Sequence, residues 1–291
     1  MSLNRQIYGL VGYPVKHSLS PSMHNAAFKY LGINAEYSLF EIEPDKLEDF
    51  LINRKDVAGF NVTVPYKVKA KDILSRGLSL KKDLSEGEAT VSITSAINTV
   101  KREPELRIYN TDVVGFSRSL IEDLGFDKKD KRVLVLGSGG AGRAIIAGLS
   151  EENNSASEIY IFEIDKDVIS STTEHLSKIE RLKDKFKFIE KSDIASIIKE
   201  CDLLVNATAV GMRDKDSSVI DLNLLHNKLN VYDVVYNRET ALIKEARSLG
   251  IPASDGLGML LYQGVAAFKI FTERDAPIDI MREALLKGVN R

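Results

Sequence analysis

The sequence predicts an α/β protein whose second half is a doubly wound nucleotide-binding domain. Short apolar runs rich in β-branched residues alternate with helix-like stretches along nearly the whole chain, a pattern typical of parallel sheets covered by helices. A glycine-rich segment at 137–142 directly follows the apolar run 132–136 and opens an apolar helical stretch. The length of 291 residues suits two domains.

Composition excludes several classes of protein. Hydrophobic residues make up 44% of the chain and charged residues 28%, an ordinary globular balance. The formal net charge of −2 offers no basic surface to nucleic acid or to membrane lipid. No apolar run reaches the ~18 residues of a membrane span, and the N-terminus lacks the apolar core of a signal peptide. We therefore expect a cytoplasmic protein with neither nucleic-acid nor membrane partners.

The single cysteine, Cys201, excludes a disulfide within the chain. It leads into the apolar run 203–205, so we expect a core position and not a nucleophile.

The first segment, residues 1–112, reads as a mixture of strands and helices. Serine before proline is a favourable helix start, so the first helix is expected at Ser20-Pro21. The pattern predicts strands at 7–12, 36–40, 57–64, 97–100 and 106–109, a second helix opened by Pro44-Asp45, and a helix-prone stretch at 68–90.

The second segment, residues 113–255, continues the alternation in a nucleotide-binding order. Gly250 is placed as the residue that follows a helix C-terminus. The pattern predicts strands at 132–136, 159–162, 186–189, 203–206 and 231–235, and helices at 113–124, after the glycine segment, from Lys166, at 194–199 and at 240–249. Residues 256–291 then predict two helices, 257–271 and 278–286.

The glycine segment is suited to a pyrophosphate. Glycines close the turn between strand and helix and let the backbone approach the phosphates, whose charge faces the helix N-terminus. An ordinary glycine-rich turn is the alternative, and the flanking strand and helix favour the nucleotide site. The candidate contacts are Gly137, Ser138, Gly139, Gly140 and Ala141.

An acid about 20 residues beyond such a loop is placed to bind the ribose diol and to repel a 2′-phosphate. Glu163 lies 21 positions after Gly142, and Asp165 follows two residues later. For Asp165 the competing interpretation is an N-cap of the helix from Lys166, and spacing does not separate the two.

Polar side chains gather at predicted strand ends and helix starts of the first segment. Ser18 and Ser20 could both reach one polyol, although spacing alone favours Ser20 as an N-cap and Ser18 as a loop hydroxyl. Lys67 follows a strand end, from which an ammonium could protonate and stabilise a developing alkoxide; most lysines, however, are surface residues. Asp112 precedes a helix and could be its N-cap. Taken singly, these residues do not decide a function.

Taken together, the motifs resemble the shikimate dehydrogenases, including their quinate/shikimate relatives. They occur in family order and span nearly the whole chain. The matching stretches are residues 8–12, 17–21, 61–67, 98–99, 110–112, 115–116, 137–143, 206–208, 211–212, 256–260 and 263–264.

The resemblance implies a substrate-binding and catalytic domain (1–112), an NAD(P)-binding Rossmann-like domain (113–255), and C-terminal helices (256–291) that pack on the substrate domain. It implies reversible interconversion of 3-dehydroshikimate and shikimate, on the route to chorismate and the aromatic amino acids. It also implies NAD or NADP as cofactor, no metal, and a monomer or homodimer.

The resemblance also assigns roles to individual residues. Lys67 and Asp112 become the catalytic pair. Substrate binding is assigned to Ser18, Ser20, Thr63, Asn98, Tyr236 and Gln263. The glycine segment holds the pyrophosphate, and Thr208, Val234 and Gly256 lie near the nicotinamide.

Two departures from the family pattern bear on these roles. NADP-using members typically carry Asn-Arg-Thr where this chain has Glu163-Ile164-Asp165, so we expect NAD to be preferred, although Lys166 and Arg143 could supply positive charge. Tyr236 is not followed by the usual proline, which weakens its assignment to the substrate.

Three other functions compete with this interpretation. A quinate/shikimate dehydrogenase of quinate catabolism suits an NAD preference. A non-catalytic shikimate-binding relative is disfavoured because both Lys67 and Asp112 are present. An unrelated NAD-dependent dehydrogenase is disfavoured by the serine and Asn-Val-Thr clusters.

Overall fold

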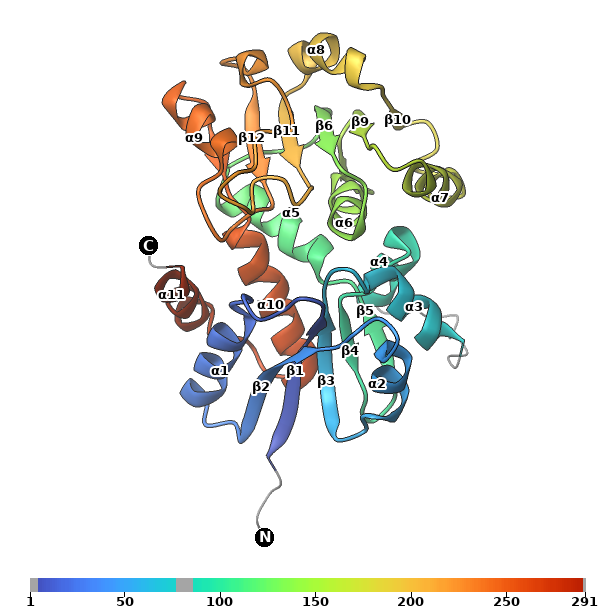
Figure 1. Cartoon of the computed structure of the whole chain (residues 1–291), viewed down its shortest axis with the longest axis vertical. Coiled ribbons are helices and arrows are strands. Elements are labelled where there is room, and N and C mark those ends of the chain that lie inside the picture. Colours follow the sequence, from blue (N-terminus) through green and yellow to red (C-terminus); the bar gives the residue numbers. More distant parts are fainter. Residues whose placement is uncertain (1–4, 77–85, 290–291) are drawn as a thin grey trace. The chain divides into compact units, whose positions relative to one another are not determined.

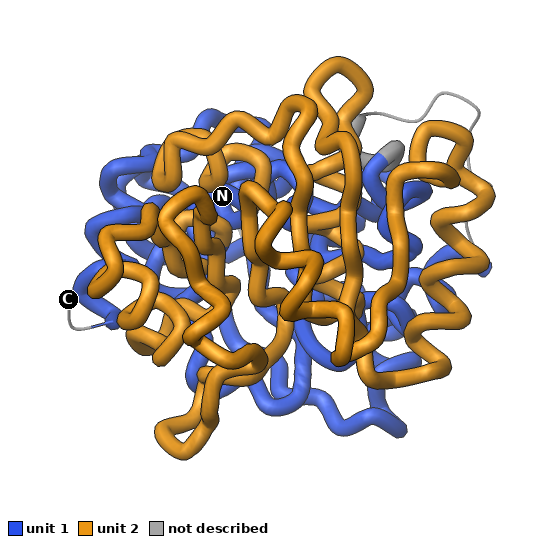
Figure 2. The backbone as a smooth tube through the Cα atoms, turned by 90° about the horizontal axis from the view of Figure 1, so that it is seen from above, with its two compact units in different colours: residues 1–115, 260–291 blue, residues 116–259 orange. Residues whose placement is uncertain are grey.

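The computed structural model describes residues 5–76 and 86–289. The chain divides into two compact units (Figure 2), residues 1–115 with 260–291 as unit 1 and residues 116–259 as unit 2. The last part of the chain thus returns to the unit that contains its beginning.

Unit 1 is built on a five-stranded mixed sheet (Figure 1). The strand order is β2 (Ala35–Glu41), β1 (Gln6–Gly12), β3 (Val57–Val62), β4 (Thr99–Lys101) and β5 (Arg107–Tyr109). Strands β2, β1 and β3 are parallel, whereas β3–β4 and β4–β5 pair antiparallel. The predicted pair at 97–100 and 106–109 is therefore present, shifted by one or two residues.

Helices supply the rest of unit 1. They are α1 (Ser20–Tyr30), α2 (Leu47–Asn53), α3 (Lys67–Ser75), α4 (Glu86–Thr94), most of α10 (Leu257–Thr272) and α11 (Ile278–Gly288). Helix α11 packs on α1, and α10 places Phe271 against Tyr8 of β1, with ring centroids 5.0 Å apart. Apolar residues of β1, β3, α2 and α3 form a continuous core, which fixes the strand ends that carry the polar site.

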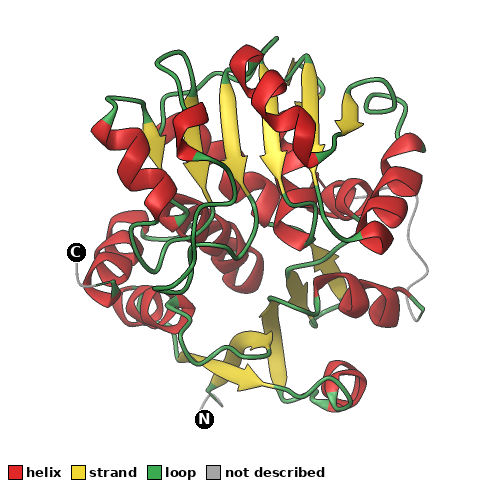
Figure 3. Cartoon of the chain, turned by 45° about the horizontal axis from the view of Figure 1, so that its top comes forward, coloured by secondary structure: helices red, strands yellow, loops and turns green. Residues whose placement is uncertain are grey.

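Unit 2 is a six-stranded parallel sheet with helices on its faces (Figure 3). The strand order is β10 (Phe186–Phe188), β9 (Glu158–Phe162), β6 (Arg132–Leu136), β11 (Leu203–Asn206), β12 (Asn230–Asp233) and β13 (Ala253–Ser254). From β6 the chain first adds β9 and β10 on one side of that strand. It then crosses over to add β11, β12 and β13 on the other side, so the strand order reverses beside β6. Ligands of such sheets bind beyond the carboxyl ends of the strands at this point.

The helices of unit 2 are the main part of α5 (Asp112–Glu122), α6 (Gly140–Leu149), α7 (Lys166–Ser177), the short α8 (Ile194–Ile197) and α9 (Ala241–Ser248). The core of this unit joins strand residues such as Leu134 and Leu204 to Ile243 of α9, and it includes Cys201. Burial raises the pKa of the Cys201 thiol to about 12, and the predicted core position of this residue is confirmed.

The predicted α/β class is confirmed, with local differences. The short hairpin β7 (Ser150–Glu151) and β8 (Asn154–Ser155) and the two-residue strand β13 were not predicted, because two residues carry no periodic signal. The helix expected at 194–199 is one α-turn continued by a 3₁₀ turn. Residues 77–85 of the helix-prone stretch lie outside the described residues. Among those described, no helix has the length and apolar character required to cross a bilayer.

Candidate active site

Lys67 and Asp112 meet in unit 1. Lys67 begins α3, just beyond the end of β3, and Asp112 begins α5, just beyond β5. The Lys67 Nζ donates to Asp112 Oδ2 at 2.5 Å, and the two side chains are only 13% and 8% exposed. An ion pair this sheltered is weakly screened by salt. The carboxylate of Asp112 accepts hydrogen bonds from the side chains of Lys67 and Asn98, so its role here is not that of a helix N-cap.

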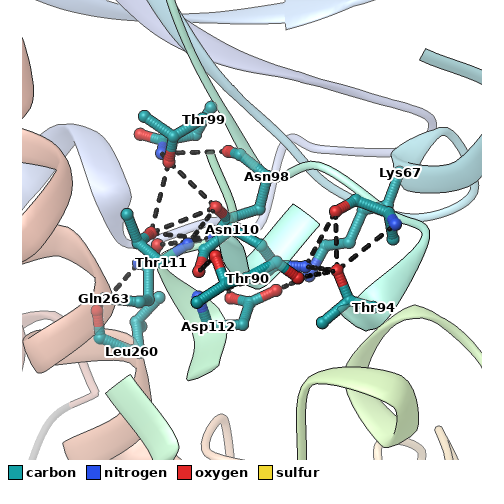
Figure 4. Close-up of polar contacts among 12 residues, drawn as sticks. Lys67, Thr90, Thr94, Asn98, Thr99, Asn110, Thr111, Asp112, Leu260 and Gln263 are labelled. Atoms are coloured by element: carbon teal, nitrogen blue, oxygen red, sulfur yellow. Dashed lines mark hydrogen bonds and ion pairs between the residues drawn. The ribbon is translucent and has the colours of Figure 1, made fainter. Parts of the chain in front are cut away.

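Asn98 orients that carboxylate (Figure 4). Its Nδ2 donates to Asp112 Oδ1 at 2.9 Å, and its Oδ1 accepts the backbone N–H of Thr111 at 2.7 Å. A carboxylate can only accept and a backbone N–H can only donate, so both ends of the amide are fixed. Asn98 is 2% exposed, and Asp112 is thereby held on one side by an amide and on the other by an ammonium.

Three buried residues extend this network, and sequence reasoning did not single them out. Thr99 Oγ1 donates to Asn98 Oδ1 at 2.9 Å and lies 3.2 Å from Thr111 Oγ1. Asn61 Nδ2 donates to Thr99 Oγ1 at 2.8 Å. All three lie within the motifs at 61–67, 98–99 and 110–112. The motifs therefore contained these buried residues, but no role was assigned to them.

A second set of bonds holds the start of α5. Asn110 Oδ1 accepts the backbone N–H of Asp112, and its Nδ2 donates to Thr94 Oγ1 and to the Ala96 carbonyl. The Thr94 hydroxyl in turn lies within hydrogen-bond distance of the Thr90 carbonyl inside α4, at 2.8 Å, and of the Ala96 carbonyl beyond it, at 2.9 Å. These bonds fix the backbone from which Asp112 projects.

Gln263 reaches the same cluster from α10. Its Oε1 lies 3.5 Å from Asn98 Nδ2, and its Nε2 donates to the Leu260 carbonyl at 2.9 Å. The structure therefore brings together Lys67, Asn98, Asp112 and Gln263, which are separated widely along the chain.

The two serines lie at the start of α1 and hydrogen-bond to each other. The Ser18 hydroxyl donates to Ser20 Oγ at 3.2 Å and accepts the Ser20 backbone N–H. The N-cap of α1 is Leu19, which makes no capping bond through its side chain, so the interpretation of Ser20 as a simple N-cap is wrong. The Ser18 hydroxyl takes up the first free N–H, which leaves Ser20 inside the helix. Thr63, half-buried, directly follows the end of β3 at Val62.

The carboxyl edge of the sheet in unit 2 carries the glycine loop. Gly137 has φ +94°, a left-handed conformation that favours glycine, and Gly139 is the N-cap of α6. A Cβ on Gly142 would lie 2.2 Å from the Gly137 carbonyl oxygen, so helix and turn touch through bare backbone. A Cβ on Gly139 would meet nothing within 4 Å. This cradle fits a dinucleotide pyrophosphate, with Ser138 in the turn and Gly140 and Ala141 in the first turn of α6.

The two acids beyond β9 have defined partners. Asp165 is the N-cap of α7, where its carboxylate accepts the backbone N–H groups of Asp167 and Val168. Glu163 Oε2 accepts the backbone N–H of Ser138 at 2.8 Å, and its Oε1 accepts those of Ile164 and Asp165. Glu163 therefore places its charge against the glycine loop, while Asp165 serves the helix.

The neighbouring strands β11 and β12 present a buried polar network. Asn206 Nδ2 donates to Asp233 Oδ1 at 2.9 Å, and the Thr240 hydroxyl donates to Oδ2 at 2.7 Å. Burial nonetheless raises the pKa of Asp233 to about 6. Asn206 Oδ1 also accepts the hydroxyl of Thr208, so the network fixes the loop after β11.

The residues predicted near the nicotinamide follow these strands. The methyl group of Thr208 lies at Gly137, and the Val234 carbonyl approaches Gly256 so closely that a Cβ there would lie 2.0 Å away. Tyr236, half-buried, also belongs to unit 2, and burial raises the pKa of its phenol. Within the described residues, no group of three or more acidic, histidine or cysteine side chains is arranged to hold a metal ion.

Comparisons with known proteins place this arrangement in a family. Residues 10–80 match the shikimate dehydrogenase substrate binding domain, and residues 256–286 match the shikimate 5′-dehydrogenase C-terminal domain. A shikimate dehydrogenase (NADP+) from Methanopyrus kandleri is 36% identical over 97% of this chain and 95% of its own length. The chain belongs to the shikimate dehydrogenase family.

Two solved structures agree with the fold over nearly the whole chain. The shikimate 5-dehydrogenase of Listeria monocytogenes, in complex with shikimate and NAD, is 30% identical with a TM-score of 0.81, covering 97% of both chains. A quinate dehydrogenase of Corynebacterium glutamicum, in complex with NAD, is 28% identical with a TM-score of 0.81, covering 97% of this chain and 99% of its own.

Proposed function

We propose that this protein is a shikimate dehydrogenase, which interconverts 3-dehydroshikimate and shikimate with a nicotinamide dinucleotide. The observation that carries the proposal is the sheltered Lys67–Asp112 pair, with Asn98 fixing the carboxylate. Membership of the family supplies the substrate class and the route to chorismate and the aromatic amino acids. A non-catalytic relative would have no use for this pair.

In this reaction the side chains of the protein transfer a proton and orient the reacting groups. A reduced dinucleotide, when bound, supplies the hydride. In the direction of reduction the carbonyl oxygen gains negative charge, and the Lys67 ammonium donates a proton to it and stabilises the charge before transfer. Asp112 holds Nζ in place, and solvent restores the proton to Lys67.

Short hydroxyl and amide side chains around this pair suit a polyhydroxylated ring acid. We assign Ser18, Ser20, Thr63, Asn98 and Gln263 to the substrate. Tyr236 is kept as a weaker candidate, because it is not followed by the proline that is usual in the family. Unit 1 is then the substrate unit, with the helices of 256–291 returning to it, and unit 2 is the dinucleotide unit.

For the dinucleotide we propose the glycine loop from Gly137 to Ala141 as the pyrophosphate site, with Thr208, Val234 and Gly256 beside the nicotinamide. We also propose that NAD is preferred over NADP. The Glu163 carboxylate sits at the loop, where it repels a 2′-phosphate and can accept from a ribose diol. Asp165 contributes charge nearby, although its oxygens cap α7.

Quinate is the second candidate substrate. The observation that favours it is the acid pair at Glu163 and Asp165, together with the likeness to an NAD-bound quinate dehydrogenase. Shikimate remains the first choice because the sequence relative cited above is a shikimate dehydrogenase.

One spectrophotometric assay tests these proposals. The purified protein is given shikimate or quinate, each with NAD or NADP, and absorbance of the reduced dinucleotide is followed. We expect the highest kcat/KM with shikimate and NAD. Faster oxidation of quinate than of shikimate would show that the protein is a quinate dehydrogenase. No oxidation of either acid would refute a dehydrogenase function on this substrate class.

A further inference from the structure

Tyr37, on the outer strand β2, is a buried tyrosine that none of the assigned roles uses. Its side chain is 1% exposed, and its hydroxyl donates to Asn61 Oδ1 at 2.7 Å. Hydrogen bonding from the Ser20 side chain lowers the pKa of this phenol, against the larger raising effect of burial. Tyr37 therefore joins a proposed substrate serine to the network that ends at the catalytic pair.

Tyr37 is held through both its backbone and its ring before any ligand is considered. Asn25 of α1 accepts the Tyr37 backbone N–H and donates to its carbonyl, both at 2.9 Å. The imidazole of His24 stacks on the phenol ring, with centroids 4.3 Å apart and an interplanar angle of 3°. A side chain clamped in this way loses little entropy when it positions a neighbour.

The direction of each hydrogen bond beyond Tyr37 is fixed. Asn61 Nδ2 donates to the Asn98 carbonyl at 3.1 Å and to Thr99 Oγ1 at 2.8 Å. Both N–H groups of the amide are therefore occupied, and its Oδ1 faces the phenol, which must donate. Through Thr99 and Asn98 the same polarity continues to the Asp112 carboxylate.

Ser20, by contrast, can change its role. The phenol oxygen can accept the proton of Ser20, and if Ser20 donates to a ligand anion instead, the phenol keeps its bond to Asn61. The Ser20 hydroxyl is therefore held in position and remains free to donate to a carboxylate or to accept from a hydroxyl. This is the property that a hydroxy acid requires of a binding serine.

We propose that Tyr37 is a positioning residue for substrate, which sets Ser20 and Asn61 through its hydroxyl and so tightens binding of the ring acid. This inference rests on the proposed function. It assigns to Tyr37 no contact with substrate, dinucleotide or the reacting atoms.

The test is Tyr37→Phe, with Tyr8→Phe as a matched control. Tyr8 is the register partner of Tyr37 on β1 and is 2% exposed. Its hydroxyl donates to the Phe271 carbonyl and not to the network. Both substitutions delete one buried phenol oxygen from the same sheet, so both should lower the melting temperature to a similar extent.

The two variants should differ in their kinetics. Tyr37→Phe should raise the shikimate KM by ~10-fold, the scale of one lost hydrogen bond, with the dinucleotide KM unchanged and kcat lowered less than the KM is raised. Tyr8→Phe should leave both KM values near wild type. In a Ser20→Ala background the added effect of Tyr37→Phe on the shikimate KM should shrink, because the two residues act together.

Several outcomes would overturn the inference. An active wild type with a shikimate KM unchanged within twofold in Tyr37→Phe would refute it alone, as would equal effects in the two tyrosine variants. A wild type that neither binds shikimate by calorimetry nor oxidises it would refute the proposed function and this inference with it. If Tyr37→Phe does not fold, Asn25→Ala, which releases the Tyr37 backbone, should still raise the shikimate KM, and an unchanged KM there would count against the proposal.

Discussion

Lys67 and Asp112 are 45 residues apart in the sequence, yet Nζ and Oδ2 lie 2.5 Å apart. Each residue begins a helix that leaves the end of a strand of the same sheet. Strand β4 pairs antiparallel with both β3 and β5, so β3 and β5 run in the same direction and their carboxyl ends lie at the same edge of the sheet. The pair is therefore a product of sheet order, and its chemistry depends on both partners being present.

Removal of either partner should reduce turnover. We expect Lys67→Ala and Asp112→Asn each to lower kcat by at least ~100-fold, the usual scale for an acid–base group, with dinucleotide binding unchanged. Lys101→Ala is the control, because Lys101 also forms an ion pair in unit 1, with Glu273 at 2.6 Å. Steady-state kinetics and dinucleotide titration provide the measurements, and near wild-type turnover in both site variants would remove the pair from the mechanism.

Two glycines of the same loop should respond differently to alanine. Gly142→Ala forces a Cβ against the Gly137 carbonyl oxygen and should lower the free energy of unfolding by ~2–3 kcal/mol. Gly139→Ala has open space around its Cβ and should cost no more than ~1 kcal/mol as an N-cap change. It should instead raise the dinucleotide KM, because the backbone approaches the pyrophosphate there. Chemical denaturation and kinetics on both variants separate the two effects, and the reverse pattern would contradict the assignment of this loop.

The acids beyond β9 should determine the choice of dinucleotide. We expect kcat/KM for NAD to exceed that for NADP by ~10-fold, about 1.4 kcal/mol of discrimination. Replacing Glu163-Ile164-Asp165 by Asn-Arg-Thr should reverse the order, since arginine suits a phosphate and the repelling carboxylates are gone.

Asp165→Asn is the control for this exchange. Asparagine caps a helix as well as aspartate does, so α7 keeps its cap and the ratio of NAD to NADP should fall much less than in the three-residue exchange, which also removes Glu163. A wild type that favours NADP would show that the Glu163 charge, held against Ser138, does not reach the 2′-phosphate and that Arg143 or Lys166 binds it.

His24 should make the protein sensitive to acid. Burial lowers the pKa of this imidazole to about 3, and neither ring nitrogen has a hydrogen-bond partner among the residues that the structure describes. Folding therefore favours the neutral imidazole. The stability of the folded state is not reduced by His24 at pH values above the unfolded pKa of about 6.5, where the ring is neutral in both states. Stability should then decline as the pH falls from about 6.5 toward 3, by up to roughly 1 kcal/mol per pH unit.

Urea unfolding between pH 4 and 7 measures this effect. His24→Phe keeps a ring against Tyr37 and should flatten the pH dependence of the unfolding free energy, whereas His17→Gln, at an exposed histidine, should not. Parallel curves for wild type and His24→Phe would show that other groups control the acid response.

The local features of this protein could be predicted from its amino-acid pattern. Apolar periodicity predicted the strands and helices, because burial on one face leaves a pattern within a few residues. Strand, glycines and helix in succession predicted the nucleotide loop, because its geometry is contained in one turn. Gly250 was placed after a helix for the same reason, and it has φ +71°. The motifs likewise supplied Lys67, Asn98, Asp112 and Gln263 as candidates.

Hydrogen bonds between residues that are far apart in the sequence became visible only in the tertiary structure. Strand order placed Asn98 between Asp112 and Thr111 and joined Tyr37 to Asn61 across β1. It also brought Glu163, at the end of β9, to the glycine loop, where its carboxylate accepts the Ser138 backbone N–H. Each of these hydrogen bonds depends on the position of a partner far along the chain, and that position follows from packing and register, which no local pattern encodes.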